Sequence, residues 1–403
     1  MESIKEIFKI GKGPSSSHTM GPKKAAEMFK GMYPGASSFA VTLYGSLAAT
    51  GKGHMTDVAL IEALKDDRSP RVDIIWKPGE FLPQHPNGMN FKAYDAEGNL
   101  MGEKTLFSIG GGDISEDGRR QPEKNIYPYS KMKDILGWCN KYNSYFWEYV
   151  AQHEESDIWD YLYDRWVVMK KAIEDGLDHE GVLPGGLNVR RKAYSYYQHA
   201  MSYQNTMQRR GLLFAYALAV SEENAAGGTI VTAPTCGSCG VLPAVLYLIH
   251  TQYKVTEKKI INAMATAGLF GSVIKANASI SGAEVGCQGE VGSACAMTCA
   301  AATRLFGGTP PQIECAAAMG MEHFLGLTCD PVCGLVQIPC IERNAFAAAR
   351  VMDCTQYSLM SDGSHIVPFD TVIEAMKRTG HDLPNLYKET AQGGLAYLVK
   401  KNR

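Results

Sequence analysis

The hydrophobic pattern changes once along the chain, near Trp147, and this change restricts the possible folds more than any single motif. Before it, short β-branched and aromatic runs bounded by Gly and Pro predict four strands, at 38–44, 71–76, 91–94 and 104–109. Between these runs, residues 56–65 show helical spacing, with Thr56 as the predicted N-cap. We expect a sheet covered on one side, which is an α+β arrangement.

After Trp147 the pattern is helical and stays helical. Four Ala-rich segments are small or apolar around most of the helix, at 210–221, 257–269, 294–305 and 341–352. Helices that are apolar on all sides are buried. The sequence therefore predicts an α+β N-terminal domain followed by an all-α domain. Residues 111–125, rich in Gly, Asp, Glu and Arg, are the best candidate for a linker or flap.

Composition excludes several classes of partner. The net charge is −2 and no basic block stands out, which argues against a nucleic-acid partner. The longest apolar runs, such as 211–220 and 241–249, are far shorter than the about 20 residues of a membrane span, so we expect no membrane partner. The N-terminus lacks the apolar core of a signal peptide, which predicts a cytoplasmic protein.

Cysteine is unevenly distributed. Of 11 cysteines, only Cys139 lies in the first half, and the other ten fall between Cys236 and Cys354. Cytoplasmic cysteines are thiols or metal ligands rather than disulfides. Four of them sit in Ala-rich helical stretches and are interpreted as small core residues: Cys295, Cys299, Cys315 and Cys354.

Three other cysteines, Cys287, Cys329 and Cys340, are framed by Gly or Pro. A packing cysteine does not need such neighbours, whereas tight turns help to aim a sulfur at a metal. Three thiolates leave a four-coordinate site open, which is typical of catalytic metal centres. Spacing alone would instead favour the pairs Cys236/Cys239 and Cys329/Cys333, so it leaves the ligands undecided.

Residues 11–22, GKGPSSSHTMGP, gather hydroxyl groups and a histidine between two Gly-Pro pairs and lead into a predicted helix at 22–32. Hydroxyls and backbone N–H groups at a helix N-terminus form an anion site, here suited to a carboxylate. The alternative is an N-cap loop without a ligand.

His54 lies between a Gly-rich turn and a helix start. The ordinary pKa of histidine suits a general base, although a lone histidine at a turn is more often structural.

Seven segments resemble the iron–sulfur-dependent L-serine dehydratases, the PLP-independent L-serine ammonia-lyases. They are residues 11–22, 45–57, 183–192, 233–243, 281–292, 326–344 and 389–396. The most specific motifs are KGPSSSHT, AEVGCQGEVG and GLTCDPV. The resemblance covers nearly the whole chain. It implies a β-type domain at 1–150, related to allosteric serine-binding domains, and an α-type catalytic domain at 151–403.

The resemblance also implies a function and its residues. The expected reaction converts L-serine to pyruvate and ammonia, in amino-acid catabolism that feeds gluconeogenesis. A [4Fe-4S] cluster would be held by Cys287, Cys329 and Cys340. His54 would be the base, and His18 would act in the site with the substrate-binding residues Ser15, Ser16, Ser17 and Thr19. These groups would meet in a cleft between the domains.

The chain departs from the family pattern at three places. Related chains often end in a cysteine that reaches the fourth iron, whereas this chain ends VKKNR, so we expect water or substrate there. Cys236 stands where many relatives have Asn, and Cys333 where Gly is common. Either cysteine could be a ligand, a redox-active thiol or a neutral change.

Three alternatives remain at this point. Threonine or cysteine could be the substrate, the chain could be a non-catalytic cluster sensor, or it could be a zinc or PLP enzyme, with Lys275 as the residue that suggests PLP. Buried small-residue helices and a sheet with a free edge favour a homodimer.

Overall fold

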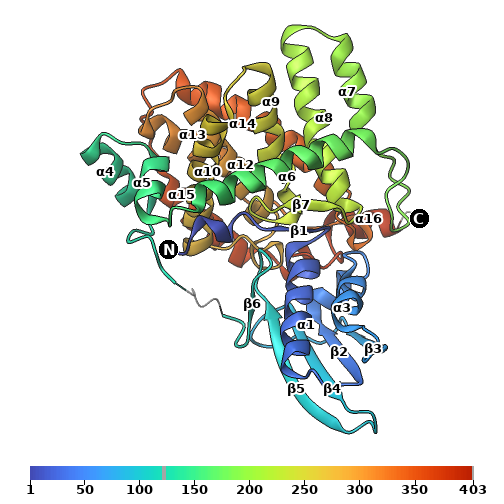
Figure 1. Ribbon diagram of the computed structural model, residues 1–403. Helices are drawn as coiled ribbons and strands as arrows, with labels where there is room; N and C mark the ends of the chain where they lie inside the picture. The colour runs from blue at the N-terminus through green and yellow to red at the C-terminus, as the bar shows by residue number, and fades with distance from the viewer. Residues whose placement is uncertain (120–123, 402–403) are drawn as a thin grey trace.

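The computed structural model describes residues 1–119 and 124–401. A sheet with its helices forms one part of the molecule and a large helical body forms the other (Figure 1). The predicted fold class, an α+β N-terminal region followed by helices, is confirmed.

The sheet has five strands in the order β3-β2-β4-β5-β6. Their bounds are β2 Ser38–Tyr44, β3 Arg71–Lys77, β4 Gly88–Tyr94, β5 Leu100–Ser108 and β6 Ile114–Ser115. β2 and β3 are parallel, and the other pairs are antiparallel. Alternate residues of β2, namely Phe39, Val41 and Leu43, are buried in one apolar cluster with residues of the neighbouring helices.

Three helices accompany this sheet: α1 Gly21–Met32, α2 Gly45–Thr50 and α3 Thr56–Leu64. Thr56 was predicted to cap α3 but is its first residue, and Met55 at φ 55° precedes it. The Thr56 hydroxyl instead donates to the His18 carbonyl at 2.5 Å, because the turn before α3 packs against residues 15–19, which we call the serine-rich loop. This turn, between α2 and α3, carries His54.

The helical body has twelve helices of eight or more described residues. They are α4 Met132–Tyr142, α5 Phe146–His153, α6 Ile158–Asp178, α7 Ala193–Ser202, α8 Asn205–Ala225, α9 Val241–Gln252, α10 Glu257–Asn277, α12 Ser293–Leu305, α13 Pro310–Glu322, α14 Cys340–Leu359, α15 Phe369–Asp382 and α16 Gly394–Lys401. A short helix, α11 Gly282–Val285, precedes α12. Most of α10 and nearly all of α12 is buried, as their composition predicts.

The first residues of the chain belong to the helical body. Met1, Ile4, Ile7 and Phe8 lie in its core, and a Cβ on Gly268 of α10 would meet Phe8 at 2.8 Å. Strand β1, Ile10–Lys12, then pairs with β7, Thr229–Val231. The chain therefore starts in the body, leaves it to build the sheet and returns at α4. The division at residue 150 stays a prediction, and this packing favours a boundary before α4.

A buried ion cluster joins the two parts. Asp113, in the loop after β5, accepts from Lys275 of α10 at 2.7 Å and also from Lys9. The two lysines outweigh burial and hold the pKa of Asp113 at about 2. The same loop places Gly110 against Ser281 and Gly112 against Met20. It therefore lies between the serine-rich loop and the segment that leads to Cys287. Part of the predicted flap, residues 120–123, lies outside the described residues.

Candidate active site

The serine-rich loop forms a π-helical turn, Ser16–Met20, that runs into α1. Ser15 caps this turn, since its Oγ accepts from the His18 N–H at 3.1 Å and lies 3.3 Å from the Ser17 hydroxyl. Ser15, Ser16, Ser17, His18 and Thr19 are all buried. The polar groups predicted to bind a carboxylate are therefore assembled, and several of them bond to one another.

His18 has a fixed tautomer. The Ser46 hydroxyl gives its only hydrogen to the Glu389 carbonyl at 2.7 Å, so at the 3.0 Å contact with Ser46 the His18 Nε2 is the donor. Burial, together with the neighbouring His54, lowers the pKa of His18 well below its usual value, so the ring is neutral. Its Nδ1 is therefore an acceptor, 2.9 Å from the Ser17 hydroxyl.

The same reasoning fixes His54. The Thr50 hydroxyl donates to the Ser46 carbonyl at 3.0 Å, so His54 Nδ1 donates to Thr50 at 3.1 Å. Burial lowers the pKa of His54 to about 3, and the neutral ring keeps an unprotonated Nε2. This nitrogen is buried and has no hydrogen-bond partner. A free lone pair inside the protein is what a general base requires.

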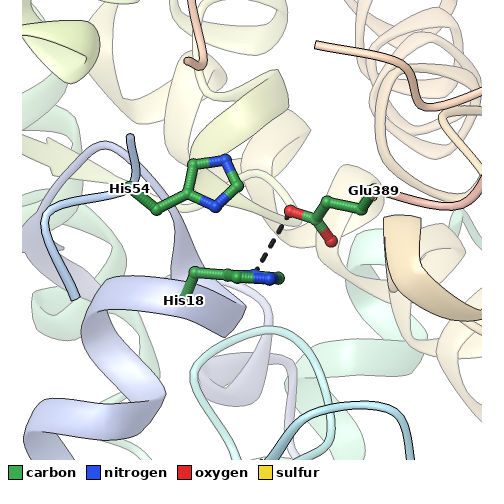
Figure 2. Close-up of side chains that lie close together, drawn as sticks. All are labelled: His18, His54 and Glu389. Atoms are coloured by element: carbon green, nitrogen blue, oxygen red, sulfur yellow. Dashed lines mark ion pairs between the residues drawn. The ribbon is translucent and has the colours of Figure 1, made fainter. Parts of the chain in front are cut away.

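Glu389, a residue to which the sequence assigned no role, completes this group. One ligand atom from each of His18, His54 and Glu389 lies within 4.8 Å of the others (Figure 2). Glu389 Oε1 is 3.3 Å from His18 Nδ1. Burial raises the pKa of Glu389 well above its usual value, with a smaller contribution from Glu290. We call these three residues the histidine set.

We call the three predicted ligands the thiol set: Cys287 and Cys340 lie at the starts of helical elements, and Cys329 lies in the loop after α13. Cys287 precedes the π-helical turn that leads into α12, and Cys340 is the first residue of α14. Cys329 forms an isolated bridge with Lys388. Helix N-termini stabilise thiolates, which favours two of these positions as metal ligands.

Arg343, one turn after Cys340, lies beside the thiol set. It donates to the Thr328 carbonyl at 2.6 Å and to Asp330 at 3.3 Å, on both sides of Cys329. Burial raises the pKa of Cys287 to about 11, and the Arg343 guanidinium opposes this effect. The sequence assigned no role to Arg343. The one pattern that could have pointed to it is its position three residues after Cys340, a predicted ligand.

The geometry of the thiol set distinguishes between kinds of metal site. Among the described residues, only the histidine set brings three ligand atoms within 4.8 Å of one another, so at least one pair of the three sulfurs is farther apart than 4.8 Å. A tetrahedral zinc with Zn–S bonds of about 2.3 Å would need sulfurs about 3.8 Å apart. A Cβ on Gly282 would lie 3.1 Å from Cys329 Sγ, so glycine keeps room beside this sulfur. Spread thiols with a nearby guanidinium fit a cluster of several metal ions.

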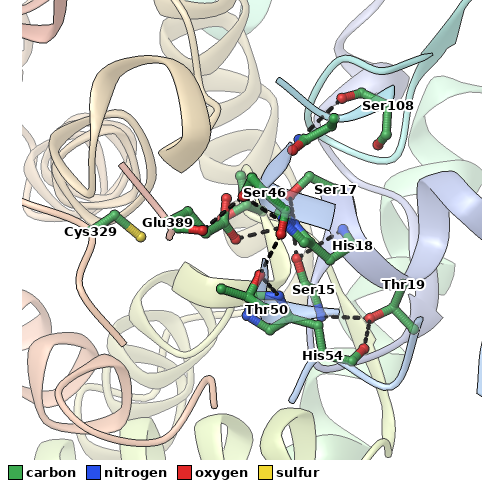
Figure 3. A network of polar contacts seen from close by, with 12 residues as sticks. Ser15, Ser17, His18, Thr19, Ser46, Thr50, His54, Ser108, Cys329 and Glu389 are labelled. Atoms are coloured by element: carbon green, nitrogen blue, oxygen red, sulfur yellow. Dashed lines mark hydrogen bonds and ion pairs between the residues drawn. The ribbon is translucent and has the colours of Figure 1, made fainter. Parts of the chain in front are cut away.

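The backbone joins the two sets. The Glu389 N–H donates to the Cys329 carbonyl at 2.8 Å, and Glu389 has φ 57°, a left-handed conformation that is uncommon for residues other than glycine. Figure 3 shows the resulting network, with Cys329 beside Glu389 and the serine-rich loop opposite. The structure thus brings the predicted histidines and the segment of a predicted ligand together between the two parts of the chain.

Glu290 is a second buried carboxyl near this network. It accepts from the Thr235 hydroxyl at 3.0 Å and from the Cys329 thiol at 3.8 Å. Burial raises its pKa to about 7. Glu290 lies within the matched segment 281–292, but no periodicity or spacing marked it.

The remaining cysteines of interest lie nearby. Cys236 is buried with its sulfur 3.4 Å from Met20 Sδ, which follows the serine-rich loop. Cys239 is also buried. Cys333 is exposed at φ 56°, and its carbonyl would lie 3.3 Å from a Cβ on Gly53.

A cavity of about 380 Å³ reaches this network from the side of the sheet. It is lined by Ser46 and Thr390, by the loop from Phe81 to Pro86, and by Lys388, His381 and Glu284. Ser46 lies between His18 and Glu389, so the cavity ends beside the histidine set.

Comparison with known proteins identifies the family of this chain. The family models for the serine dehydratase alpha chain and beta chain match residues 49–396 and 3–74. L-serine dehydratase of Streptomyces coelicolor is 41% identical, covering 98% of each chain. L-serine dehydratase 1 of Escherichia coli is 40% identical, covering 99% of this chain and 100% of its own. L-serine dehydratase TdcG of Escherichia coli is 42% identical, covering 99% of each chain. In residues 1–119 and 124–401, no helix is long and apolar enough to cross a membrane. The chain belongs to the serine dehydratase family, with alpha-chain and beta-chain regions in one polypeptide.

Proposed function

We propose that this protein is an L-serine dehydratase that converts L-serine to pyruvate and ammonia. A [4Fe-4S] cluster held by Cys287, Cys329 and Cys340 would be its cofactor, without PLP. The names of its relatives support the substrate, and the spread of the thiol set supports the cluster. The observation that carries the proposal is the buried, unpartnered Nε2 of His54.

His54 would remove the α-proton of L-serine at Nε2, and the tautomer fixed by Thr50 leaves that nitrogen free to accept it. A substrate carboxylate, bound by Ser15, Ser16, Ser17 and Thr19 with His18, would raise the low pKa of His54 during the reaction. The cluster, when bound, supplies a Lewis acid that makes the β-hydroxyl a better leaving group. The product, aminoacrylate, tautomerises and hydrolyses to pyruvate and ammonia.

Lys275 does not favour a PLP enzyme. Its ammonium pairs with Asp113 at 2.7 Å and lies 3.7 Å from Glu2, in the ion cluster that joins the two parts. An aldehyde cofactor would have to displace both carboxylates. If the protein were only a non-catalytic cluster sensor, the free Nε2 of His54 would have no role.

The decisive experiment is anaerobic incubation of the cluster-loaded protein with L-serine, followed by measurement of pyruvate and ammonia in equal amounts. Threonine and cysteine belong in the same panel of substrates. An open pocket discriminates only modestly against the one added methyl group of threonine. Absence of pyruvate from a protein that retains its cluster would refute the proposal. A cytoplasmic homodimer acting in amino-acid catabolism is part of the same proposal, and sedimentation tests the dimer.

A further inference from the structure

We propose that Glu389 forms the subsite for the α-ammonium group of the substrate, an inference that rests on the proposed function and deepens it. The residues predicted from the sequence account for the carboxylate, the α-proton and the hydroxyl of a β-hydroxy amino acid. None of them accounts for the positive charge.

Glu389 stands apart from the other buried carboxyl groups of the helical body. Glu223 pairs with Arg191 and His179, and Asp330 pairs with Arg343. Glu389 Oε2 is the one buried carboxylate oxygen in the described residues that has no hydrogen-bond partner. No Lys or Arg of the described part of the chain forms an ion pair with Glu389, whose only such contact is His18. A buried carboxyl oxygen is ordinarily satisfied, so a missing donor points to a ligand.

The hydrogen-bond accounting gives the chemistry of that ligand. Glu389 Oε1 lies 3.3 Å from His18 Nδ1, and the carboxylate form accepts at both oxygens, so the unpartnered Oε2 needs a donor. The other unpartnered atom of the histidine set, His54 Nε2, is an acceptor too. Both atoms therefore need donors, which an anion does not supply. A primary ammonium brings three N–H donors and the charge that favours an ionised carboxyl.

The placement of Glu389 suits this role. Its backbone is fixed by the hydrogen bond to Cys329, and the Ser46 hydroxyl donates to its carbonyl. His54 and Glu389 lie within the 4.8 Å limit of the histidine set, so an ammonium at Oε2 would bring the adjacent α-carbon near the base.

An unreactive pair of isosteric ligands tests this subsite without turnover. L-Alanine carries the ammonium, whereas L-lactate has a hydroxyl in its place, and neither has a β-hydroxyl to lose. Their dissociation constants would be measured by anaerobic calorimetry on the cluster-loaded wild type and on Glu389→Gln. We expect the wild type to prefer L-alanine by about 10- to 100-fold, the range for a hydrogen bond to a charged group. Glu389→Gln should reduce that preference to less than about threefold, mainly by weakening L-alanine.

Glu314→Gln is the matched control. Glu314 is also buried, but its carboxyl is bonded to the Phe369 N–H and to His365, neither of which belongs to the histidine set. It should keep the wild-type preference. Equal weakening of both ligands in Glu389→Gln would overturn the subsite and indicate a general structural role. Should that variant fail to retain the cluster, the wild-type ratio decides, and equal binding of the two ligands refutes the proposal. Failure of L-serine turnover would leave this binding test intact, so the two proposals fail separately.

Discussion

The two halves of the candidate site are built in opposite ways. The thiol set lies in the helical body, with its sulfurs spread and a guanidinium beside them. The histidine set is compact, its two imidazoles are fully buried, and both rings have a tautomer fixed by neighbouring hydroxyls. The histidine set and two of the thiols are buried, whereas Cys340 is partly exposed. The histidine set keeps two acceptor atoms, His54 Nε2 and Glu389 Oε2, without a hydrogen-bond partner.

This difference separates holding a cofactor from moving a proton. A spread set of thiols has no use until a metal group joins its members. A compact set with one free lone pair can accept a proton without a change of structure. Substitutions in the two halves should therefore give different combinations of lost cofactor and lost turnover.

The largest effect is expected for Cys287→Ala. Removal of one of three ligands should abolish both turnover and the visible sulfur-to-iron charge-transfer absorption, because two thiols do not retain a cluster that is open at its fourth iron. Iron content and the absorption spectrum after anaerobic loading measure this. Cys295→Ala, a buried thiol inside α12, is the control and should keep both signals. A full complement of iron in Cys287→Ala would remove Cys287 from the ligand set.

His54→Gln should lower turnover by about 10² to 10⁴-fold and leave the cluster spectrum unchanged, because it removes the base and no ligand. Exchange of the substrate α-proton with solvent deuterium, followed by NMR, tests the role directly. His199→Gln changes an exposed histidine and should have no effect. Exchange at the wild-type rate in His54→Gln would assign the base to another group.

Ser46→Ala should have a smaller effect, a fall in kcat/KM of about 30-fold, since it removes two hydroxyl hydrogen bonds worth about 1 kcal/mol each. The substitution removes the contact that fixes the tautomer of His18 and the hydrogen bond to the Glu389 carbonyl, and it leaves the thiol set unchanged. Steady-state kinetics with an iron assay separates the two halves here. The exposed Ser195→Ala provides the comparison. Loss of iron in Ser46→Ala would show that the halves are not independent.

The smallest effect is expected from pH. His54 has a pKa lowered to about 3, so its base form persists in the free enzyme as the pH falls from 7.5 to 5.5. A histidine with the ordinary pKa of about 6.5 would lose about tenfold of its base form at pH 5.5. We therefore expect kcat/KM to fall much less than tenfold over this range, measured anaerobically with an intact cluster. A titration centred near 6.5 that disappears in His54→Gln would contradict the burial of this ring.

Local patterns predicted most of the fold. The strands at 38–44 and 71–76 and the four Ala-rich helices appear where alternation and apolar composition placed them, because these signals are short-range. The prediction that Thr56 caps the helix was wrong, because its hydroxyl donates to the carbonyl of His18 in a distant segment. The pairing of β1 with β7 and the packing of residues 1–8 in the helical core depend on contacts more than 200 residues apart, which periodicity does not report.

The site was predictable in residue type but not in arrangement. Hydroxyl density marked the serine-rich loop, and Gly and Pro marked the thiol set, although only family resemblance chose its members over the closer pairs. Glu389 carried no such mark. Its position follows from a left-handed backbone and a bridge between Cys329 and Lys388, both products of the folded chain.

The path of the first residues has a consequence for how the protein holds together. Because Met1–Phe8 packs in the helical body and the chain re-enters that body at α4, the sheet region is anchored at both ends. A cut between the sheet and α4 would leave two fragments, of which the smaller supplies part of the core of the larger. Such fragments should reassemble as complementing pieces, and in the intact chain the double tether keeps the histidines at a high effective concentration beside the thiols.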